Sequence, residues 1–524
     1  MLRVKFLCSA AIVTFLLFYL PGFQALAQDY SRNIWYFGNS SQGLVFSKAN
    51  NTPEIVNNQN NIFGSGGSAV ATDMLTMDLL FYTDGVRVYD SRHQAMPGGN
   101  LNGNPAGNQP VALAPVPNVL DRYIIFANSA TFGSPGAISY SIVDMTQNVP
   151  DPQANVAYGE IITLNSAAGI NNVSEGMITV SGGNPRSFYL ITTEYNGTAV
   201  NVYEIVGPGT FNLVSTVNLP SPMIIGNLNY NPVIGKLVAA PQSENANVHL
   251  FDFDPATGTI TYDQAILNSA NSDFTGQSIY DTEWSPNGRF LYISRHGGAG
   301  DVANIYQFDL NNPANGLQDV LNNDIYRSYG LQIAPDGNIY HLYQNTVASN
   351  IELGVINEPD SLFNLVDYQS QPFPNDNFNG RQFPQFLPRM DLPPLDIDFT
   401  YLDSCQNDVT KFFPEVADDS EPLPDFYRWD FGDGNGTSNA IAPVYTYENP
   451  GVYNVTLVVG RSGQLDTIAK PVQILQNDNQ LQLPADTVIC PDEVLTLDPG
   501  SGGASYAWST GETSQTIDVD TTGY

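Results

Sequence analysis

The stretch WSPNGRFLYISRHGGAGDVANIYQFDL (residues 284–310) holds one complete copy of the pattern that decides the fold. A Pro-Asn-Gly turn leads into a hydrophobic, aromatic strand, which breaks at polar residues and glycines, and a second strand then ends near Asp309. The same unit recurs along the chain, at 33–47, 78–90, 121–145, 186–206, 235–254, 288–310 and 337–356. The related turns YNPVIG, SPNG and APDG precede three of the units, and Asn287 and Asp336 lie about 50 residues apart, a period typical of propeller blades.

The repeats therefore predict a seven-bladed β-propeller over residues 28–390. The segment GRQFPQFLPRM (380–390) is expected to complete the N-terminal blade and close the ring. Two β-sandwiches in series are the alternative, but sandwiches do not repeat turns of the PNGRFLYIS type.

Composition favours an all-β chain of more than one domain. The 45 glycines, 36 prolines, 28 tyrosines and 27 phenylalanines come without a long helical pattern, which is typical of strands joined by tight turns. A length of 524 residues exceeds what a single core supports, so we expect two or three domains. Beyond the N-terminal segment only Cys405 and Cys490 remain, too few for a disulfide framework.

The charge of the chain limits its partners. With 18 basic and 52 acidic residues, the net charge of −34 repels nucleic acid and anionic lipid, so neither is expected to bind. The surface carboxylates can instead attract cations.

The N-terminus has the pattern of a secretory signal peptide over residues 1–27. Arg3 and Lys5 precede the apolar run FLCSAAIVTFLLFYL, and ALA (25–27) supplies the small residues that a signal peptidase reads, so cleavage is expected after Ala27. Cys8 follows Phe-Leu and lacks the context of a lipoprotein anchor. No later stretch is long and apolar enough to span a membrane. The sequence predicts a protein that is secreted or displayed at the cell surface.

A second and a third module follow the propeller. The prolines of DLPPLDIDF (391–399) predict a stiff linker that opens a domain over 391–475. In GVYNVTLVV (451–459) one face of a half-buried sandwich strand is formed by Tyr453, Val455, Leu457 and Val459. Residues 476–524 begin another small sandwich, with Trp508 as its expected core aromatic, and break off in mid-pattern.

The motif FYRWDFGDGNGTSN (426–439) raises the question of a metal site. Asp430 and Asp433 are three residues apart, which does not match the alternate oxygen ligands of an EF-hand loop, so they are weak candidates for a divalent ion such as Ca²⁺. A turn explains them better, with Trp429 and Phe431 in the core, Asp433 capping backbone amides and Gly434 supplying a positive φ.

This segment resembles a PKD domain, an immunoglobulin-like sandwich named after polycystic kidney disease. YRWDFGDGNG and the later PVYTYENPGVYNVTLVV (443–459) match the family's W-D-F-G-D-G and P-G-x-Y-x-V-x-L patterns, with Tyr445 where the family often has His. The tail after residue 476 is similar to the Ig-like repeats that follow PKD domains.

The propeller segment resembles the N-terminal module of very large secreted proteins of gliding Bacteroidota. The shared stretches are LLFYTDGVRVYDSRHQAMPGG (79–99), YSIVDM (140–145), VSEGM (173–177), LFDFDPATG (250–258) and WSPNGRFLYIS (284–294). The resemblance implies export by the type IX secretion machinery, a type B sorting domain and a link to gliding motility. Because no sorting domain occurs in this sequence, we expect the chain to be a fragment of a longer protein.

Few residues carry a pattern of catalytic or metal chemistry. Asp252 and Asp254 lie on one face of a strand and are weak ion candidates, although such aspartates usually end a strand and hold its turn. The four histidines, His93, His249, His296 and His341, fall in different units and form no zinc motif, and no G-x-S-x-G elbow occurs. Glu175 is the acid most expected near the central channel, either in ligand binding or as a hydrogen-bonded acid between blades.

These features favour a non-catalytic recognition or adhesion protein without a cofactor. The propeller would bind an extracellular protein or polysaccharide, the PKD and Ig-like modules would act as spacers, and Tyr427 and Tyr445 are candidates for polysaccharide contact. The alternative is a secreted propeller glycoside hydrolase or lyase with an accessory carbohydrate-binding PKD domain. Two carboxylates about 5–9 Å apart in a cleft would favour that alternative.

Overall fold

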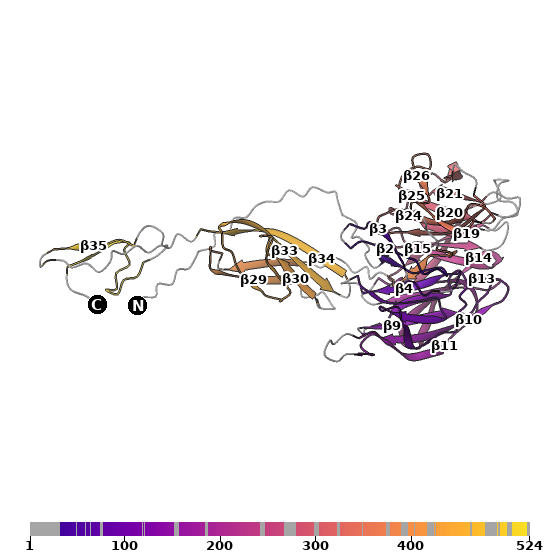
Figure 1. The fold of residues 1–524 in the computed structure, drawn as a ribbon, viewed down its shortest axis with the longest axis horizontal. Helices are drawn as coiled ribbons and strands as arrows, with labels where there is room; N and C mark the ends of the chain where they lie inside the picture. Colours follow the sequence, from indigo (N-terminus) through magenta and orange to yellow (C-terminus); the bar gives the residue numbers. More distant parts are fainter. Residues whose placement is uncertain are drawn as a thin grey trace. The chain divides into compact units, whose positions relative to one another are not determined.

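The computed structural model describes residues 32–520 except for residues 49, 58, 63, 74–76, 118, 120, 151–156, 184–186, 242–246, 267–278, 298–302, 322–324, 348, 374–377, 389–396, 403, 417–423, 425, 462–463, 477–489, 491–492 and 500–505. The described residues fall into two compact units, one within Gln24–Leu392 and one within Pro393–Tyr524 (Figure 1). They contain strands, turns and the short 3-10 helix η3 (Pro313–Asn315) but no α-helix, so the predicted all-β class is confirmed. The predicted signal peptide lies outside the described residues.

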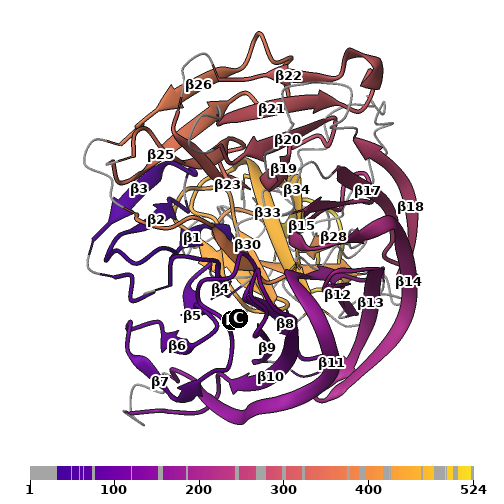
Figure 2. The ribbon, with the colours of Figure 1, turned by 90° about the vertical axis from the view of Figure 1, so that its right-hand side faces the viewer.

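The first unit is a β-propeller, whose blades follow one another around a closed ring (Figure 2). Its first blade has three strands, β1 (Ile34–Trp35), β2 (Gly43–Phe46) and β3 (Pro53–Val56). The second has β4 (Ser68–Thr72), β5 (Leu79–Thr83), β6 (Arg87–Asp90) and β7 (Ala95–Asn100).

Two further blades share one seven-stranded sheet because the 22-residue strand β11 (Glu160–Ser181) belongs to both. The early part of β11 pairs with β10, and its later part, Val173–Ser181, pairs with β12. The remaining strands of this sheet are β8 (Val111–Pro115), β9 (Arg122–Asn128), β10 (Gly136–Asp144), β12 (Phe188–Glu194), β13 (Gly197–Gly207) and β14 (Thr210–Met223).

Three separate four-stranded sheets complete the ring. The first has β15 (Ile225–Asn231), β16 (Lys236–Pro241), β17 (Val248–Asp254) and β18 (Thr259–Ile266). The second has β19 (Ile279–Trp284), β20 (Phe290–Arg295), β21 (Asn304–Asp309) and β22 (Leu317–Asp319). The third has β23 (Arg327–Ile333), β24 (Ile339–Gln344), β25 (Ile351–Asn357) and β26 (Asp367–Ser370).

Each predicted repeat coincides with one hairpin of a blade. These hairpins are β1–β2, β5–β6, β9–β10, β12–β13, β16–β17, β20–β21 and β24–β25. The predicted turns are also present, since the Oδ1 atoms of Asn287 and Asp336 accept the backbone N–H groups of Arg289 and Asn338. Gly288 and Gly337 follow these residues and have φ angles of 73° and 83°, a conformation that would be strained for a residue with a side chain. Within the described residues, the seven blades agree with the seven predicted repeats.

The segment that closes the ring differs from the expectation. Strand β27 (Pro384–Phe386) does not complete the blade β1–β3 but pairs in parallel with β4 of the next blade. The first strand of each four-stranded blade is its inner strand, and the chain enters it from the last, outer strand of the blade before it. A segment that follows the outer strand β26 therefore has the direction of an inner strand, so it pairs with the inner strand β4 in parallel.

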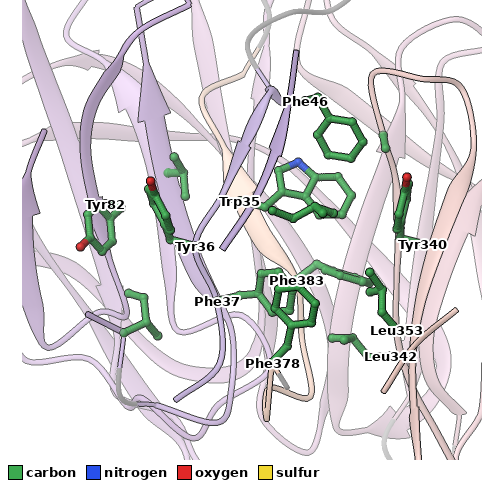
Figure 3. Close-up of a cluster of buried hydrophobic side chains, with 14 of the residues drawn as sticks. Trp35, Tyr36, Phe37, Phe46, Tyr82, Tyr340, Leu342, Leu353, Phe378 and Phe383 are labelled. Atoms are coloured by element: carbon green, nitrogen blue, oxygen red, sulfur yellow. The ribbon is translucent and has the colours of Figure 1, made fainter. Parts of the chain in front are cut away.

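Aromatic packing nevertheless joins the same segment to the first blade. Trp35 lies between Phe46, Tyr340 and Phe383, with ring centroids 5.1, 5.5 and 5.1 Å away (Figure 3). Phe37 stacks on Phe378 at 4.9 Å. The two ends of the propeller sequence thus meet in one buried cluster with side chains of β24 and β25.

The second unit contains a two-sheet sandwich. One sheet has β28 (Ile397–Leu402), β29 (Val409–Val416) and β32 (Val444–Thr446). The other has β31 (Thr437–Ser438), β30 (Phe426–Asp430), β33 (Gly451–Arg461) and β34 (Gln464–Ile474). The predicted alternation of β33 is confirmed, because Val455, Leu457 and Val459 are fully buried whereas Val452 is 68% exposed.

Two expectations for this unit need correction. The predicted linker 391–399 runs too far, because Phe399 lies in β28 and is buried against Phe412 and Trp429. Trp508 is half-buried and not a buried core residue, since the described tail contributes only the short pair β35 (Leu495–Leu497) and β36 (Ile517–Val519). Cys405 and Cys490 form no disulfide.

Candidate functional site

Two acidic side chains lie side by side on the inner strand β19. Asp281 and Glu283 are two residues apart, so the pleat of the strand directs both to the same face. They are only 3% and 2% exposed. Buried carboxylates are rare without partners, so the groups that surround them decide what they can do.

Asp281 is held by donors from two other segments. Its Oδ2 accepts the backbone N–H of Leu331 on β23 at 3.0 Å and the side-chain amide of Gln382 at 2.8 Å. Its Oδ1 accepts the N–H of Thr282. Burial raises the pKa of Asp281 to about 7, and the neighbouring charge of Glu283 acts in the same direction, against the lowering effect of the hydrogen bonds.

Glu283 joins three inner strands. Its Oε1 accepts the N–H of Trp284 at 2.7 Å and the side-chain amide of Asn229 on β15 at 3.0 Å, and its Oε2 accepts the N–H of Ile333 on β23 at 2.9 Å. Burial raises the pKa of this carboxyl group as well. Both acids are therefore bound to the backbone or amide donors of neighbouring blades, an arrangement that fastens the blades together.

A cavity of about 240 Å³ is lined by Asp281 together with residues of the inner strands β11, β15 and β23. Its deep part is formed by Asn108, Asp281 and Gln382, which are all less than 10% exposed. At its outer part lie Gly183 and Pro232, which follow the C-terminal ends of β11 and β15 and are exposed. The cavity thus opens at the end of the ring where these two inner strands finish.

Amide side chains dominate the polar wall of the cavity. The Oε1 atom of Gln109 accepts the N–H groups of Met177 and Leu228, both at 2.9 Å, and its Nε2 donates to the carbonyl of Leu228 at 2.7 Å. Gln385 donates to the carbonyl of Met177 at 2.9 Å. These bonds cross from one inner strand to another and hold the wall in place.

Three polar atoms at the cavity have no hydrogen-bond partner among the described residues. They are the Nδ2 of Asn108, the Oε1 of Gln382 and the Oγ of Ser181, and all three atoms are buried. A buried donor or acceptor without a partner costs about 1–3 kcal/mol, so such atoms are normally satisfied by water or by a ligand. Here both a donor and acceptors are preset beside the same small cavity, which suits a polar molecule.

Glu175 lies in the later part of β11 and is 5% exposed. Its Oε2 accepts the backbone N–H of Asn108, in the segment that precedes β8, at 3.0 Å. The carboxylate thus connects one blade to the next and touches the backbone of a cavity residue, and it does not itself line the cavity.

One pair of side chains has the geometry of a nucleophile and its base. The Oγ of Ser328 lies 2.8 Å from Nε2 of His341, and Nδ1 of His341 lies 2.9 Å from the hydroxyl of Tyr368. However, Ser328 and His341 are both completely buried, and burial lowers the pKa of His341 to about 3. A substrate cannot reach such a hydroxyl, so this group serves to join β23, β24 and β26.

The aspartates predicted as weak ion ligands in the propeller have other partners. Asp252 pairs with Lys236 at 2.7 Å. Asp254 ends β17 and accepts the N–H of Ala256 and the hydroxyl of Thr257, as expected for a residue that holds a turn. Within the described ranges, no three His, Cys, Asp or Glu side chains come together as a metal site.

The carboxylates of the WDFGDGNG turn are used inside the turn. Asp430 accepts the N–H of Gly432, and Oδ1 of Asp433 accepts those of Asn435 and Gly436. Oδ2 of Asp433 accepts the hydroxyl of Tyr445 at 2.5 Å. Gly434 has a φ of 81°, so the structural interpretation of this motif as a tight turn is confirmed.

The two tyrosines proposed for polysaccharide contact are only partly accessible. The ring of Tyr445 stacks on Phe431 at 4.1 Å, which covers one of its faces. Tyr427 is half-buried against the core of the sandwich.

Sequence reasoning did not single out Asp281, Asn108 or Gln382. The available signal was the alternation in YDTEW (280–284), where two acids on one strand face come directly before the SPNG turn. Asn108 and Gln382 lie in loops, before β8 and β27, and show no periodicity in the sequence. They meet at the cavity only because the ring closes.

Comparison with known families identifies one module. A family described as PKD domain matches residues 396–474, in agreement with the sandwich described above. No curated protein matches the sequence. Among the described residues, no helix has the length and apolar character needed to cross a membrane.

Several solved structures are similar to the propeller part. A proposed 6-phosphogluconolactonase from Bacteroides uniformis ATCC 8492 is 14% identical, with 67% of this chain and 99% of that chain covered and a TM-score of 0.40. The propeller domain of Cps50 (Swd1) from Myceliophteria thermophila is 11% identical, with 60% of this chain and 93% of that chain covered and a TM-score of 0.36. A hypothetical selenium-binding protein from Sulfolobus tokodaii is 10% identical, with 65% of this chain and 92% of that chain covered and a TM-score of 0.39. Similarity at this level carries no functional information, so the propeller assignment rests on the strand pairing itself.

Proposed function

We propose that this chain is part of an exported, non-catalytic recognition protein whose propeller binds an extracellular protein or polysaccharide. The PKD domain at 396–474 and the Ig-like tail would serve as spacers between the propeller and the cell. The signal-like N-terminus supports export. The resemblance to secreted Bacteroidota proteins supports the type IX route and a part in gliding motility.

The observation that carries this proposal is the polar cavity of the propeller. Its unpartnered Asn108 and Gln382 atoms are suited to hydrogen-bond a ligand, whereas the adjacent acids, Asp281 and Glu283, already accept bonds at every oxygen. A general acid or base must be able to exchange a proton with a substrate, and carboxylates fixed in this way are better suited to hold structure. Binding is therefore favoured over turnover.

A secreted glycoside hydrolase or lyase is the second candidate function. Asp281 lines the cavity, has a pKa raised to about 7 by burial, and neighbours a second carboxyl group. A raised pKa beside another acid is the property required of a general acid. This candidate predicts that polysaccharide cleavage is detectable and that Asp281→Asn abolishes it.

The test of the proposed function uses Asn108→Ala, because the side-chain amide of Asn108 has an atom without an internal partner. The purified chain is screened on immobilised polysaccharides and extracellular proteins, and the best ligand is titrated by calorimetry. Asn108→Ala should weaken binding about tenfold without lowering the melting temperature. Asn350→Ala, an exposed residue that does not line the cavity, is the control and should bind normally. Equal binding by Asn108→Ala would contradict the assignment of the cavity.

Tyr427 and Tyr445 remain proposed secondary contacts for polysaccharide. Replacing each by Ala in the same titration distinguishes a contribution from the PKD domain from one made by the propeller.

A further inference from the structure

Two arginines of the propeller, Arg327 and Arg381, lie near the side chain of Tyr329 and have no acidic partner among the described residues. In this unit, the described residues Lys48, Arg92, Arg122, Lys236 and Arg289 each form an ion pair with aspartate. Arg327 and Arg381 form no ion pair with any described acid. The described acids thus leave these two cations without a salt bridge, and in a chain with 52 acidic and 18 basic residues such a place suits an anion that comes from outside.

The position of both arginines is fixed by the inner strands. Arg327 begins β23, and its Nη1 donates to the carbonyl of Gly297 at 2.8 Å and to Nδ1 of His296 at 3.1 Å. Arg381 precedes β27, and its backbone is bonded to Ser65 and Gly330 at 3.0 Å each, while the residue itself is exposed. The anchored backbone fixes the point from which the exposed Arg381 side chain extends, so only the side chain itself has to be ordered when a ligand binds.

Aromatic rings surround the two guanidinium groups. Tyr280 stacks on His296 at 5.5 Å, and Tyr329 meets both rings edge-on at 5.2 and 5.3 Å. The guanidinium carbon of Arg381 lies 5.9 Å from the ring centre of Tyr329. We call these five residues, Tyr280, His296, Arg327, Tyr329 and Arg381, the arginine–aromatic patch.

The positive charge of the patch is set by its arginines. Burial, followed by the charges of Arg327 and Arg381, lowers the pKa of His296 to about 4, so this ring is neutral and accepts the hydrogen bond from Arg327. The acids on the elements packed against the patch, Asp281 and Glu175, are buried and bonded to backbone donors.

The patch is distinct from the cavity. Tyr280, Arg327 and Tyr329 belong to the N-terminal ends of β19 and β23, and His296 follows β20, whose last residue pairs with Ile279. The outer part of the cavity instead lies where β11 and β15 finish. The two features therefore lie toward opposite ends of the inner strands.

We propose that the arginine–aromatic patch binds a sugar ring bearing a single carboxylate, such as a uronate within an otherwise neutral glycan. Guanidinium groups match a carboxylate in geometry and charge, and the partly exposed rings of Tyr280 and His296 can pack on the apolar face of a ring-shaped ligand, whereas Tyr329 is only 5% exposed and belongs to the core. An isolated carboxylate is favoured over a polyanion because the net charge of −34 repels a dense array of negative charges. This inference rests on the proposed function and adds the ligand class.

The experiment compares small probes on the full chain. Methyl β-D-glucuronide, methyl β-D-glucoside, methyl β-D-glucoside 6-sulfate and a short aspartate-containing peptide are titrated by ligand-observed NMR or calorimetry. The uronide should bind about tenfold more tightly than the neutral glucoside. The Arg381→Gln and Arg327→Gln variants should each lose that preference, and 0.5 M salt should weaken it.

Arg122→Gln is the matched control, since Arg122 is a propeller arginine already paired with Asp144 at 2.9 Å. It should keep the preference for the uronide. Because Arg381 is exposed, Arg381→Gln should fold normally, and an unchanged melting temperature separates lost binding from lost structure.

Four results would overturn the proposal: equal binding of uronide and glucoside, equal or tighter binding of the sulfate, equal or tighter binding of the peptide, or full affinity in Arg381→Gln. If a neutral glycan binds, Asn108→Ala weakens its binding and Arg381→Gln has no effect, the proposed function stands and only this inference is rejected.

Discussion

The Oδ2 atom of Asp281 accepts the side-chain amide of Gln382 at 2.8 Å and so connects the inner strand β19 to the segment that closes the propeller. The same oxygen accepts the N–H of Leu331 on β23. One buried acid thus joins two blades and the C-terminal end of the ring, which makes it a centre of both stability and pH response.

Replacing Asp281 by Ala should destabilise the propeller. The change leaves the Leu331 N–H and the Gln382 amide without an acceptor, and each unsatisfied group costs about 1–3 kcal/mol. Chemical unfolding of the whole chain, followed by tryptophan fluorescence, measures the loss. Asp252→Ala is the control, because Asp252 forms only a surface pair with Lys236, and surface pairs contribute little. Equal effects of the two substitutions would reject the linking role.

The pH dependence of Asp281 has a defined sign. Its folded pKa of about 7 lies above the ordinary 3.8, so between these values the folded state retains a proton that the unfolded state has lost. The contribution of Asp281 to stability therefore decreases as pH rises from about 4 to 7 and is constant above that. The difference in unfolding free energy between the original protein and Asp281→Asn should follow this course. A difference in unfolding free energy that does not change with pH would show that the pKa of this carboxyl group is not raised.

His341 should make the protein sensitive to acid. Burial lowers its pKa from the ordinary 6.5 to about 3, so in this range the unfolded state binds a proton that the folded state excludes. Stability is then lost as pH falls below about 6.5. His341→Gln, which can still hydrogen-bond Ser328 and Tyr368, should show a shallower loss between pH 6.5 and 4. An identical acid profile would contradict the assignment.

Phe383 is expected to be essential for ring closure. It is 2% exposed and packs on Trp35 and Phe37, at 5.1 and 5.0 Å, so it joins the end of the propeller sequence to its start. Phe383→Ala should cost about 3–5 kcal/mol, the usual range for truncating a buried phenylalanine. Phe132→Ala, at a position 59% exposed, is the control and should have little effect on the denaturation midpoint.

The PKD turn should be insensitive to calcium. Asp433 already bonds two backbone N–H groups and Tyr445, so its oxygens are occupied without a metal. Neither calcium chloride nor a chelator should shift the melting transition, whereas Asp433→Ala should lower it. A clear stabilisation by calcium that Asp433→Ala removes would favour an ion site instead.

Much of the fold could be predicted because the hairpins repeat in both pattern and turn chemistry. The turns at Asn287 and Asp336 use the same local hydrogen bonds, which neighbouring residues encode directly. The sandwich was equally visible, because the burial of Trp429 and Phe431 follows from strand alternation around a glycine-rich turn.

The contacts around the propeller cavity could not be predicted in the same way. Gln382 reaches Asp281 across about a hundred residues, and Gln109 reaches Leu228 over a similar distance along the chain. Such contacts depend on the closure of the ring and on its register. The pairing of β27 with β4 is also a property of the ring, which explains why the expected completion of the first blade was wrong.

The central claim, binding without turnover at the propeller cavity, is tested most directly by measuring both on the same sample. The best-binding polysaccharide is incubated with the original protein, Asn108→Ala and Asp281→Asn, and bound glycan and newly formed chain ends are quantified together. We predict saturable binding that Asn108→Ala weakens, with no chain ends above background. Chain ends released by the original protein and lost in Asp281→Asn would contradict the account and assign the cavity to an enzyme.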